Sequence, residues 1–138
     1  MGVVVPHKAI DVVSNSANPK QAIFDFVGDL SGVRIPGNRL LVGTYMRPEK
    51  TKGGIIRPDS NKEEDVWQGK VGLVLKWGSQ AFVDDDEYHF PVEDRAQVGE
   101  WVVYNVVDAR TIMVNGYPCR IIKDSGIQAM VDNPEIIF

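Results

Sequence analysis

Residues 39–46 begin a part of the chain in which apolar and strand-forming residues dominate. This segment reads Arg-Leu-Leu-Val-Gly-Thr-Tyr-Met and ends before Arg47-Pro48. Its β-branched and aromatic residues favour a strand, and proline does not continue one. Similar patterns predict two more strands, at 66–77 and at 99–104. The first of these contains two glycines, a feature of strands that bend or bulge.

Asn115-Gly116 is a strong signal for a tight hairpin. It lies between two apolar segments, 111–114 and 117–122. Both central residues of a type I′ turn need a positive φ, which Asn and Gly tolerate best. After this hairpin, the pattern of 125–131 allows either a short helical turn or a last strand.

The first 36 residues differ from the rest because they show little strand periodicity. Within them, 19–27 predicts a short amphipathic helix, with Asn18 as its N-cap, Pro19 at its first position and Gly28 at its end. The predicted apolar face consists of Ala22, Ile23, Phe26 and Val27. The sequence leaves open whether this part is an arm packed on a neighbouring molecule or a partly disordered extension.

About five short strands with glycine bends and little helix favour an all-β protein, a small irregular β-barrel. We therefore expect an extension over 1–36, a barrel over 37–133 and an apolar tail over 134–138. Two connections inside the barrel, 48–66 and 79–97, are too long for simple hairpins. Loops of this length in a compact domain are usually functional or disordered.

Composition and charge narrow the classes of function. The chain has 138 residues, 43% of them hydrophobic and 25% charged, with a formal net charge of −4. This balance disfavours nucleic acid as a partner, because it provides no basic field to gather phosphates. Cys119 is the only cysteine, so no intrachain disulfide can form, and a reducing cytoplasm is the expected compartment. The apolar runs are too short to span a bilayer.

The candidates for catalysis or metal binding are weak. His7 and His89 lie far apart in the sequence, and the single cysteine makes a structural zinc site unfavourable. The acidic run 84–87 lacks the ligand order of a calcium loop, so we interpret it as a solvated loop tip. Trp67 and two further tryptophans suit core or interface packing better than stacking on bases, because lysine and arginine are sparse around them. We therefore expect no enzyme activity, metal or cofactor.

The 48–66 loop carries one small apolar patch, Ile55-Ile56. It is preceded by Gly53-Gly54, followed by Pro58, and surrounded by charged and small residues. Two interpretations stay open on composition alone. The isoleucines either pack back onto the barrel or form a short docking motif that becomes ordered on a partner.

Several motifs in the order of the chain resemble the co-chaperonin (GroES, or chaperonin-10) family. The similarity covers 36–131 without a break in order. The motifs that carry it are Pro36, Arg39-Leu-Leu-Val42, Gly53-Gly54-Ile55-Ile56, Gly69-Lys-Val71 through Trp77-Gly78, Val98-Gly99-Glu100-Trp101-Val102 and Ile127-Gln-Ala-Met-Val131.

This resemblance implies a GroES-like barrel that assembles into a ring, a homo-heptamer, and caps a chaperonin chamber. The mobile loop would bind the apical domains of a GroEL-type chaperonin through Gly53, Gly54, Ile55, Ile56 and Arg57. The chaperonin would hydrolyse ATP and enclose an unfolded client protein. The 79–97 loop would be the roof hairpin, and terminal strands of adjacent subunits would pair, which hides their edges.

The chain departs from the family at several places. Arg57 stands where the family has a third apolar loop residue, which implies a weaker or differently tuned contact. The extension and the tail suit a divergent, virus-encoded member, whose compartment would then be the host cytoplasm. Two alternatives come from other classes of protein: a β-barrel structural or adaptor protein without chaperonin activity, and a binder of single-stranded nucleic acid.

Overall fold

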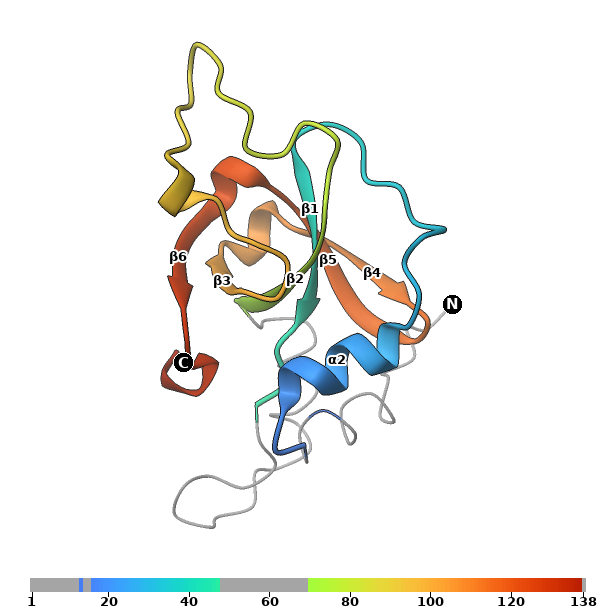
Figure 1. The fold of residues 1–138 in the computed structure, drawn as a ribbon. Helices are drawn as coiled ribbons and strands as arrows, with labels where there is room; N and C mark the ends of the chain where they lie inside the picture. The colour runs from blue at the N-terminus through green and yellow to red at the C-terminus, as the bar shows by residue number, and fades with distance from the viewer. Residues whose placement is uncertain (1–12, 14–15, 48–69, 138) are drawn as a thin grey trace.

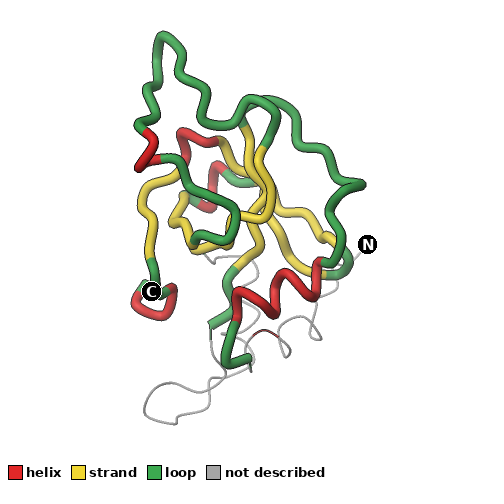
Figure 2. The backbone as a smooth tube through the Cα atoms, viewed as in Figure 1, coloured by secondary structure: helices red, strands yellow, loops and turns green. Residues whose placement is uncertain are grey.

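The computed structural model describes residue 13 and residues 16–47 and 70–137. Six antiparallel strands form one sheet in the order β4-β5-β1-β2-β3-β6, which curls into a small barrel (Figure 1). A long loop connects β2 to β3, whereas the connections from β3 to β4, β4 to β5 and β5 to β6 are short (Figure 2). The strands are β1 (Arg39–Thr44), β2 (Val71–Trp77), β3 (Trp101–Tyr104), β4 (Arg110–Val114), β5 (Tyr117–Lys123) and β6 (Ile127–Val131). Within 16–47 and 70–137, the helix α2 spans Pro19–Val27, and there are four short 3₁₀ turns, η1 (Val92–Asp94), η2 (Val106–Asp108), η3 (Asp124–Gly126) and η4 (Pro134–Ile136). The predicted all-β class is therefore confirmed.

β1 is the centre of the sheet. It pairs with β2 on one side, from Leu40 opposite Trp77 to Thr44 opposite Gly72, with a register shift in between. On the other side it pairs with β5, where Gly43 opposite Cys119 is the last pair. The β1 residues Leu40, Leu41 and Val42 are all fully buried, although their side chains alternate between the two faces of the sheet. A strand that is paired on both edges and buried on both faces holds the remaining elements in place.

The expected strands form with small changes at their ends. β3 begins at Trp101 rather than at Gly99, because Gly99 has a φ of +93° in the turn that precedes the strand. Residues 66–69 of the second predicted strand lie outside the described residues. The hairpin at Asn115-Gly116 is confirmed, with φ values of +50° and +81°.

The segment 125–131, left open by the sequence, contains both alternatives. The 3₁₀ turn η3 runs directly into β6, which pairs with β3 in an antiparallel register from Trp101 opposite Val131. The sheet therefore has one strand more than the five that we expected. In the tail, Asn133 caps η4 by accepting a hydrogen bond from the N–H of Glu135 at 3.0 Å.

The buried apolar residues form two clusters on the two faces of the sheet. The helix-side cluster includes Ile23 and Val27 of α2, Leu41, Tyr45 and Trp101. The roof-side cluster is centred on Leu40, Val42, Val102, Phe82 and Phe90. Since alternate residues of a strand face opposite ways, β1, β2, β3, β5 and β6 contribute to both clusters, whereas β4 contributes only to the helix-side cluster.

The helix 19–27 is confirmed, and so are its caps. The Asn18 side chain accepts a hydrogen bond from the N–H of Gln21 at 3.2 Å, and Gly28, with a φ of +70°, ends the helix. Ile23 and Val27 are fully buried against the sheet of the same chain. This arrangement was not among the alternatives drawn from the sequence for this part of the extension, because amphipathicity shows that a face is apolar without showing what covers it.

We predict that Gly78→Ala destabilises the barrel by about 3 kcal/mol. A Cβ at this position would lie 2.5 Å from the carbonyl oxygens of both Arg39 and Gly37, and backbone cannot move aside as a side chain can. Urea denaturation followed by fluorescence would measure the loss. Gly32→Ala is the matched control, because a Cβ there has no neighbour within 4 Å. Equal stability of the two variants would contradict the prediction.

Candidate binding site

The residues that the sequence assigns to binding, Gly53, Gly54, Ile55, Ile56 and Arg57, lie outside the described residues. The structure does describe the barrel residues that precede and follow the segment in which they lie. The chain leaves the described barrel after Arg47 and returns at Lys70. These ends decide where on the molecule the 48–69 segment begins.

The outgoing end is firmly packed. Tyr45 and Met46, which follow β1, are each only 1% exposed. The Tyr45 N–H donates to the Val71 carbonyl at 2.9 Å, and its ring lies 5.2 Å from that of Trp101. The returning end is tied to β3, because the Tyr104 N–H donates to the Lys70 carbonyl at 3.0 Å. Both ends of the 48–69 segment therefore belong to the same patch of paired strands.

A buried arginine lies on the roof-side face of the sheet near these ends. Arg120, in β5, is fully buried and stands opposite Val42. Its Nη1 donates to the hydroxyl of Tyr104 at 3.0 Å, and its Nε donates to Thr111 at 3.3 Å. Burial raises the pKa of Tyr104 above its usual value, although the nearby guanidinium acts the other way. Arg120 was not among the residues predicted from the sequence, because its only signal is a charged residue within an apolar strand.

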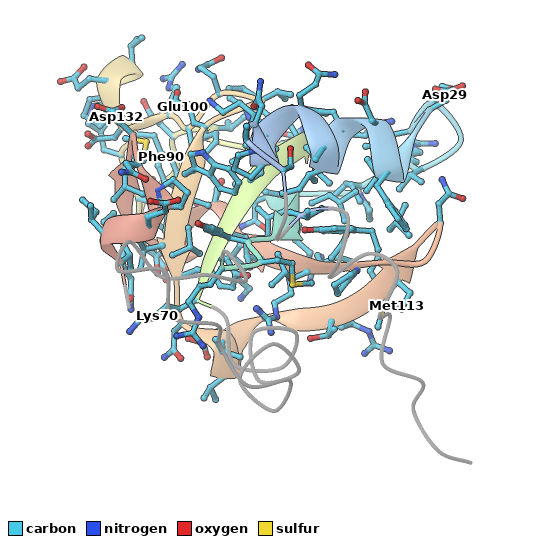
Figure 3. All side chains as sticks on the ribbon, turned by 90° about the horizontal axis from the view of Figure 1, so that it is seen from below. Asp29, Lys70, Phe90, Glu100, Met113 and Asp132 are labelled. Atoms are coloured by element: carbon cyan, nitrogen blue, oxygen red, sulfur yellow. The ribbon has the colours of Figure 1, made fainter. Side chains whose placement is uncertain are left out.

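The 79–97 segment, the expected roof, is ordered by aromatic side chains. The rings of Trp77 and Phe82 lie 5.0 Å apart, and those of Phe82 and Phe90 lie 5.4 Å apart, both edge to face. Trp77 Nε1 donates to the carbonyl of Ala96 at 2.8 Å. In the view from below, Phe90, Glu100 and Asp132 lie on the side of the barrel away from Asp29 and Met113 (Figure 3). The ring contacts and the hydrogen bond of Trp77 join the start and the end of the segment to the barrel.

Asp124 holds the roof from the end of β5. Its carboxylate is 4% exposed and accepts hydrogen bonds from the N–H of Phe82 at 2.8 Å and from that of Ser125 at 2.7 Å. Phe82 has a φ of +58°, which is uncommon for a bulky residue and persists only where its surroundings require it. Asp124 and the aromatic contacts together supply that requirement.

The acidic run 84–87 forms a turn of the roof. Asp84 accepts a hydrogen bond from the Phe90 N–H at 2.7 Å, which lowers the pKa of its carboxyl, and lies 3.0 Å from His89 Nδ1. Asp85 accepts from the N–H groups of Glu87 and Tyr88. Two of these carboxylates therefore shape the turn, a role beyond the solvated loop tip that we expected.

The described residues offer little for redox or metal chemistry. No three His, Cys, Asp or Glu side chains among them come together in a way that could hold a metal ion. Burial raises the pKa of Cys119 to about 12. Trp101 is 3% exposed and Trp77 packs on the roof-side cluster, which confirms core packing for these two. Trp67 lies outside the described residues. No helix in the described part of the chain is long and apolar enough to cross a membrane.

A small antiparallel barrel that holds both ends of a long segment on adjacent strands is the fold of a GroES-like protein. The family model of the chaperonin 10 kDa subunit matches residues 33–131, more than half of the chain, so the protein belongs to this family. The match begins after α2 and includes the roof segment.

Curated relatives agree with the family model. The chain is 31% identical over 99 residues to the co-chaperonin GroES of Hyphomonas neptunium, a match that covers 69% of this chain and 92% of that protein. It is 32% identical over 94 residues to the co-chaperonin GroES of Dinoroseobacter shibae, covering 68% of this chain and 84% of the relative. The co-chaperonin GroES of Coprothermobacter proteolyticus is 33% identical over 95 residues, covering 69% and 90%.

We predict that Asp124→Ala lowers the free energy of unfolding by about 2 kcal/mol, because it leaves two backbone N–H groups without their acceptor. The roof should also become sensitive to limited proteolysis within 79–97. Asp132→Ala is the control, since that side chain is exposed. Unchanged stability and unchanged proteolysis would show that the carboxylate does not hold the roof.

We also predict that the Cys119 thiol of the folded protein reacts with a disulfide reagent at pH 8 on the order of 1000-fold more slowly than in urea. The raised pKa lowers the thiolate fraction, and the thiolate is the reactive form. Because the folded pKa is raised, this group adds stability below pH 9, which is lost as the pH rises toward 12. Similar rates in both states would contradict the burial of the thiol.

Proposed function

We propose that this protein is a co-chaperonin that caps a GroEL-type chaperonin ring and assists ATP-dependent protein folding. The observation that carries the proposal is the family match over 33–131, together with co-chaperonin relatives that align over most of their length. In this proposal the chaperonin hydrolyses ATP, and this chain carries no catalysis.

The proposed contact is the 48–69 segment, with Ile55 and Ile56 entering an apolar groove on the chaperonin apical domain. Burying both side chains would contribute up to roughly 3–6 kcal/mol. Ordering a handful of residues costs about 1–2 kcal/mol each, so a single copy would bind weakly. Arg57, where the family has an apolar residue, would lay its aliphatic stem along the rim of the groove.

A ring resolves the weakness of the single contact. Several copies held together bind with an avidity above that of one copy, and each contact remains easy to release. We therefore propose a homo-heptamer, with an unfolded client protein inside the chamber that it closes. The proposed location is the cytoplasm, or the host cytoplasm if a virus encodes the chain.

We predict that the purified protein runs under native conditions at about seven times its mass of 15.3 kDa. It should also slow the ATP turnover of a bacterial GroEL-type chaperonin. Ile55→Asp should abolish this effect, because a carboxylate cannot enter an apolar groove without a large desolvation cost.

Ser60→Asp is the matched control, since it adds the same charge at a polar position of the same segment. It should retain the suppression of ATP turnover. A monomer that leaves the chaperonin unaffected in the presence of ATP would overturn the proposal and favour the adaptor alternative. In that case Ile55→Asp would have no effect on function.

A further inference from the structure

α2 lies directly on the strand that leads to the 48–69 segment. Ile23 is fully buried, and its Cγ2 lies 2.8 Å from where a Cβ on Gly43 would stand. The helix can approach β1 this closely only because Gly43 has no side chain. Gly43 is the residue before Thr44, with which β1 ends. α2 and this end of β1 lie at the same end of the barrel, the lower end in Figure 1.

A second contact runs from the helix to β5. The ring of Phe26 packs on that of Tyr117, with centroids 5.7 Å apart. Tyr117 is fully buried, and its hydroxyl donates a hydrogen bond to the carbonyl of Thr44. Burial raises the pKa of Tyr117 well above its usual value, so the hydroxyl keeps the proton that it donates.

The hydroxyl of Tyr117 donates its hydrogen bond at the point where the pairing of β1 with β5 ends. The paired residues of β1 and β5 end at Gly43 and Cys119. The hydrogen bond from Tyr117 to Thr44 therefore extends the link between these strands by one residue. The next residue, Tyr45, is held by Val71, so Thr44 lies between two anchored positions.

The C-terminal end of α2 makes a second contact with the same hairpin. Asn115 Nδ2 donates to the carbonyl of Val27, the last residue of the helix. Asn115 belongs to the turn that joins β4 to β5, and Tyr117 follows this turn. The helix, the turn and the start of β5 therefore form one packed unit beside Thr44.

We propose that α2 is a positioning element, and that through Phe26 and Tyr117 it fixes the point at which the 48–69 segment leaves the barrel. This role rests on the proposed function, in which that segment binds the chaperonin. α2 lies before the region that the family model matches, so this device is added to the family barrel. A fixed origin restricts the volume that each segment explores, which raises its effective concentration at a binding site.

Tyr117→Phe tests the role with the smallest change, because it removes one hydroxyl and keeps the ring that packs on Phe26. We expect the amide of Tyr45 to exchange hydrogen about 10-fold faster, because local opening no longer has to break the hydrogen bond from Tyr117 to the Thr44 carbonyl. The concentration that half-suppresses the ATP turnover of the chaperonin should rise several-fold. Phe26→Ala, which removes the contact from the helix side, should change both readouts in the same direction.

Ile122→Val is the matched control, because it removes one buried methyl from β5 in the roof-side cluster. It should lower overall stability without changing either readout beyond that loss. If Tyr117→Phe behaves like Ile122→Val in both readouts, the positioning role is wrong.

The wild type separates the two proposals: if it has no effect on the chaperonin, the proposed function fails and the positioning role fails with it. If the wild type is active and Tyr117→Phe is equally active, only the positioning role fails.

Discussion

The position of β1 is the constraint on which the rest of the structure depends. This strand is paired on both edges, with β2 and β5, and its residues alternate between the two buried clusters. A strand with no free edge and no free face cannot shift without disturbing the packing on both sides. Three residues, 45–47, separate the end of this strand from the 48–69 segment, so the segment starts close to the most enclosed part of the barrel.

The two clusters divide the molecule into two regions with different tasks. The helix-side cluster surrounds the outgoing end of the 48–69 segment through Tyr45 and Met46, and the roof-side cluster supports the roof through Phe82 and Phe90. The sheet lies between them. A change in the packing of the roof therefore reaches the other face only through the strands. This separation suits the proposed function, in which one segment would bind the chaperonin while another part would close its chamber.

The sequence predicted the local structure well where the signal is local. Asn18, Pro19 and Gly28 delimit α2, and Asn115-Gly116 determines the hairpin, because these residues act through their own backbone or the nearest N–H groups. The family was also identifiable, since its motifs occur in order along the chain.

Other features could not be predicted because they depend on contacts distant in sequence. The roof is ordered partly by Asp124, which accepts a hydrogen bond from a backbone N–H 42 residues away in the sequence. It is also ordered by aromatic rings that have no regular spacing along the chain. The packing of α2 on β1 depends on Gly43, and this role can be recognised only once the position of the helix is known. Arg120 was missed because a charged residue in a strand is usually exposed. The predicted binding residues themselves lie outside the described part of the chain, and the structure shows the barrel residues on either side of their segment.

The close approach of Ile23 to Gly43 also links two parts of the chain in evolution. A chain without α2 would lack the closest of the contacts that a Cβ at position 43 would make, and a side chain gained there while α2 is present would have to displace Ile23. The glycine and the helix are therefore coupled by their packing. In homologous chains, the residue at this position should therefore indicate whether a helix covers the barrel.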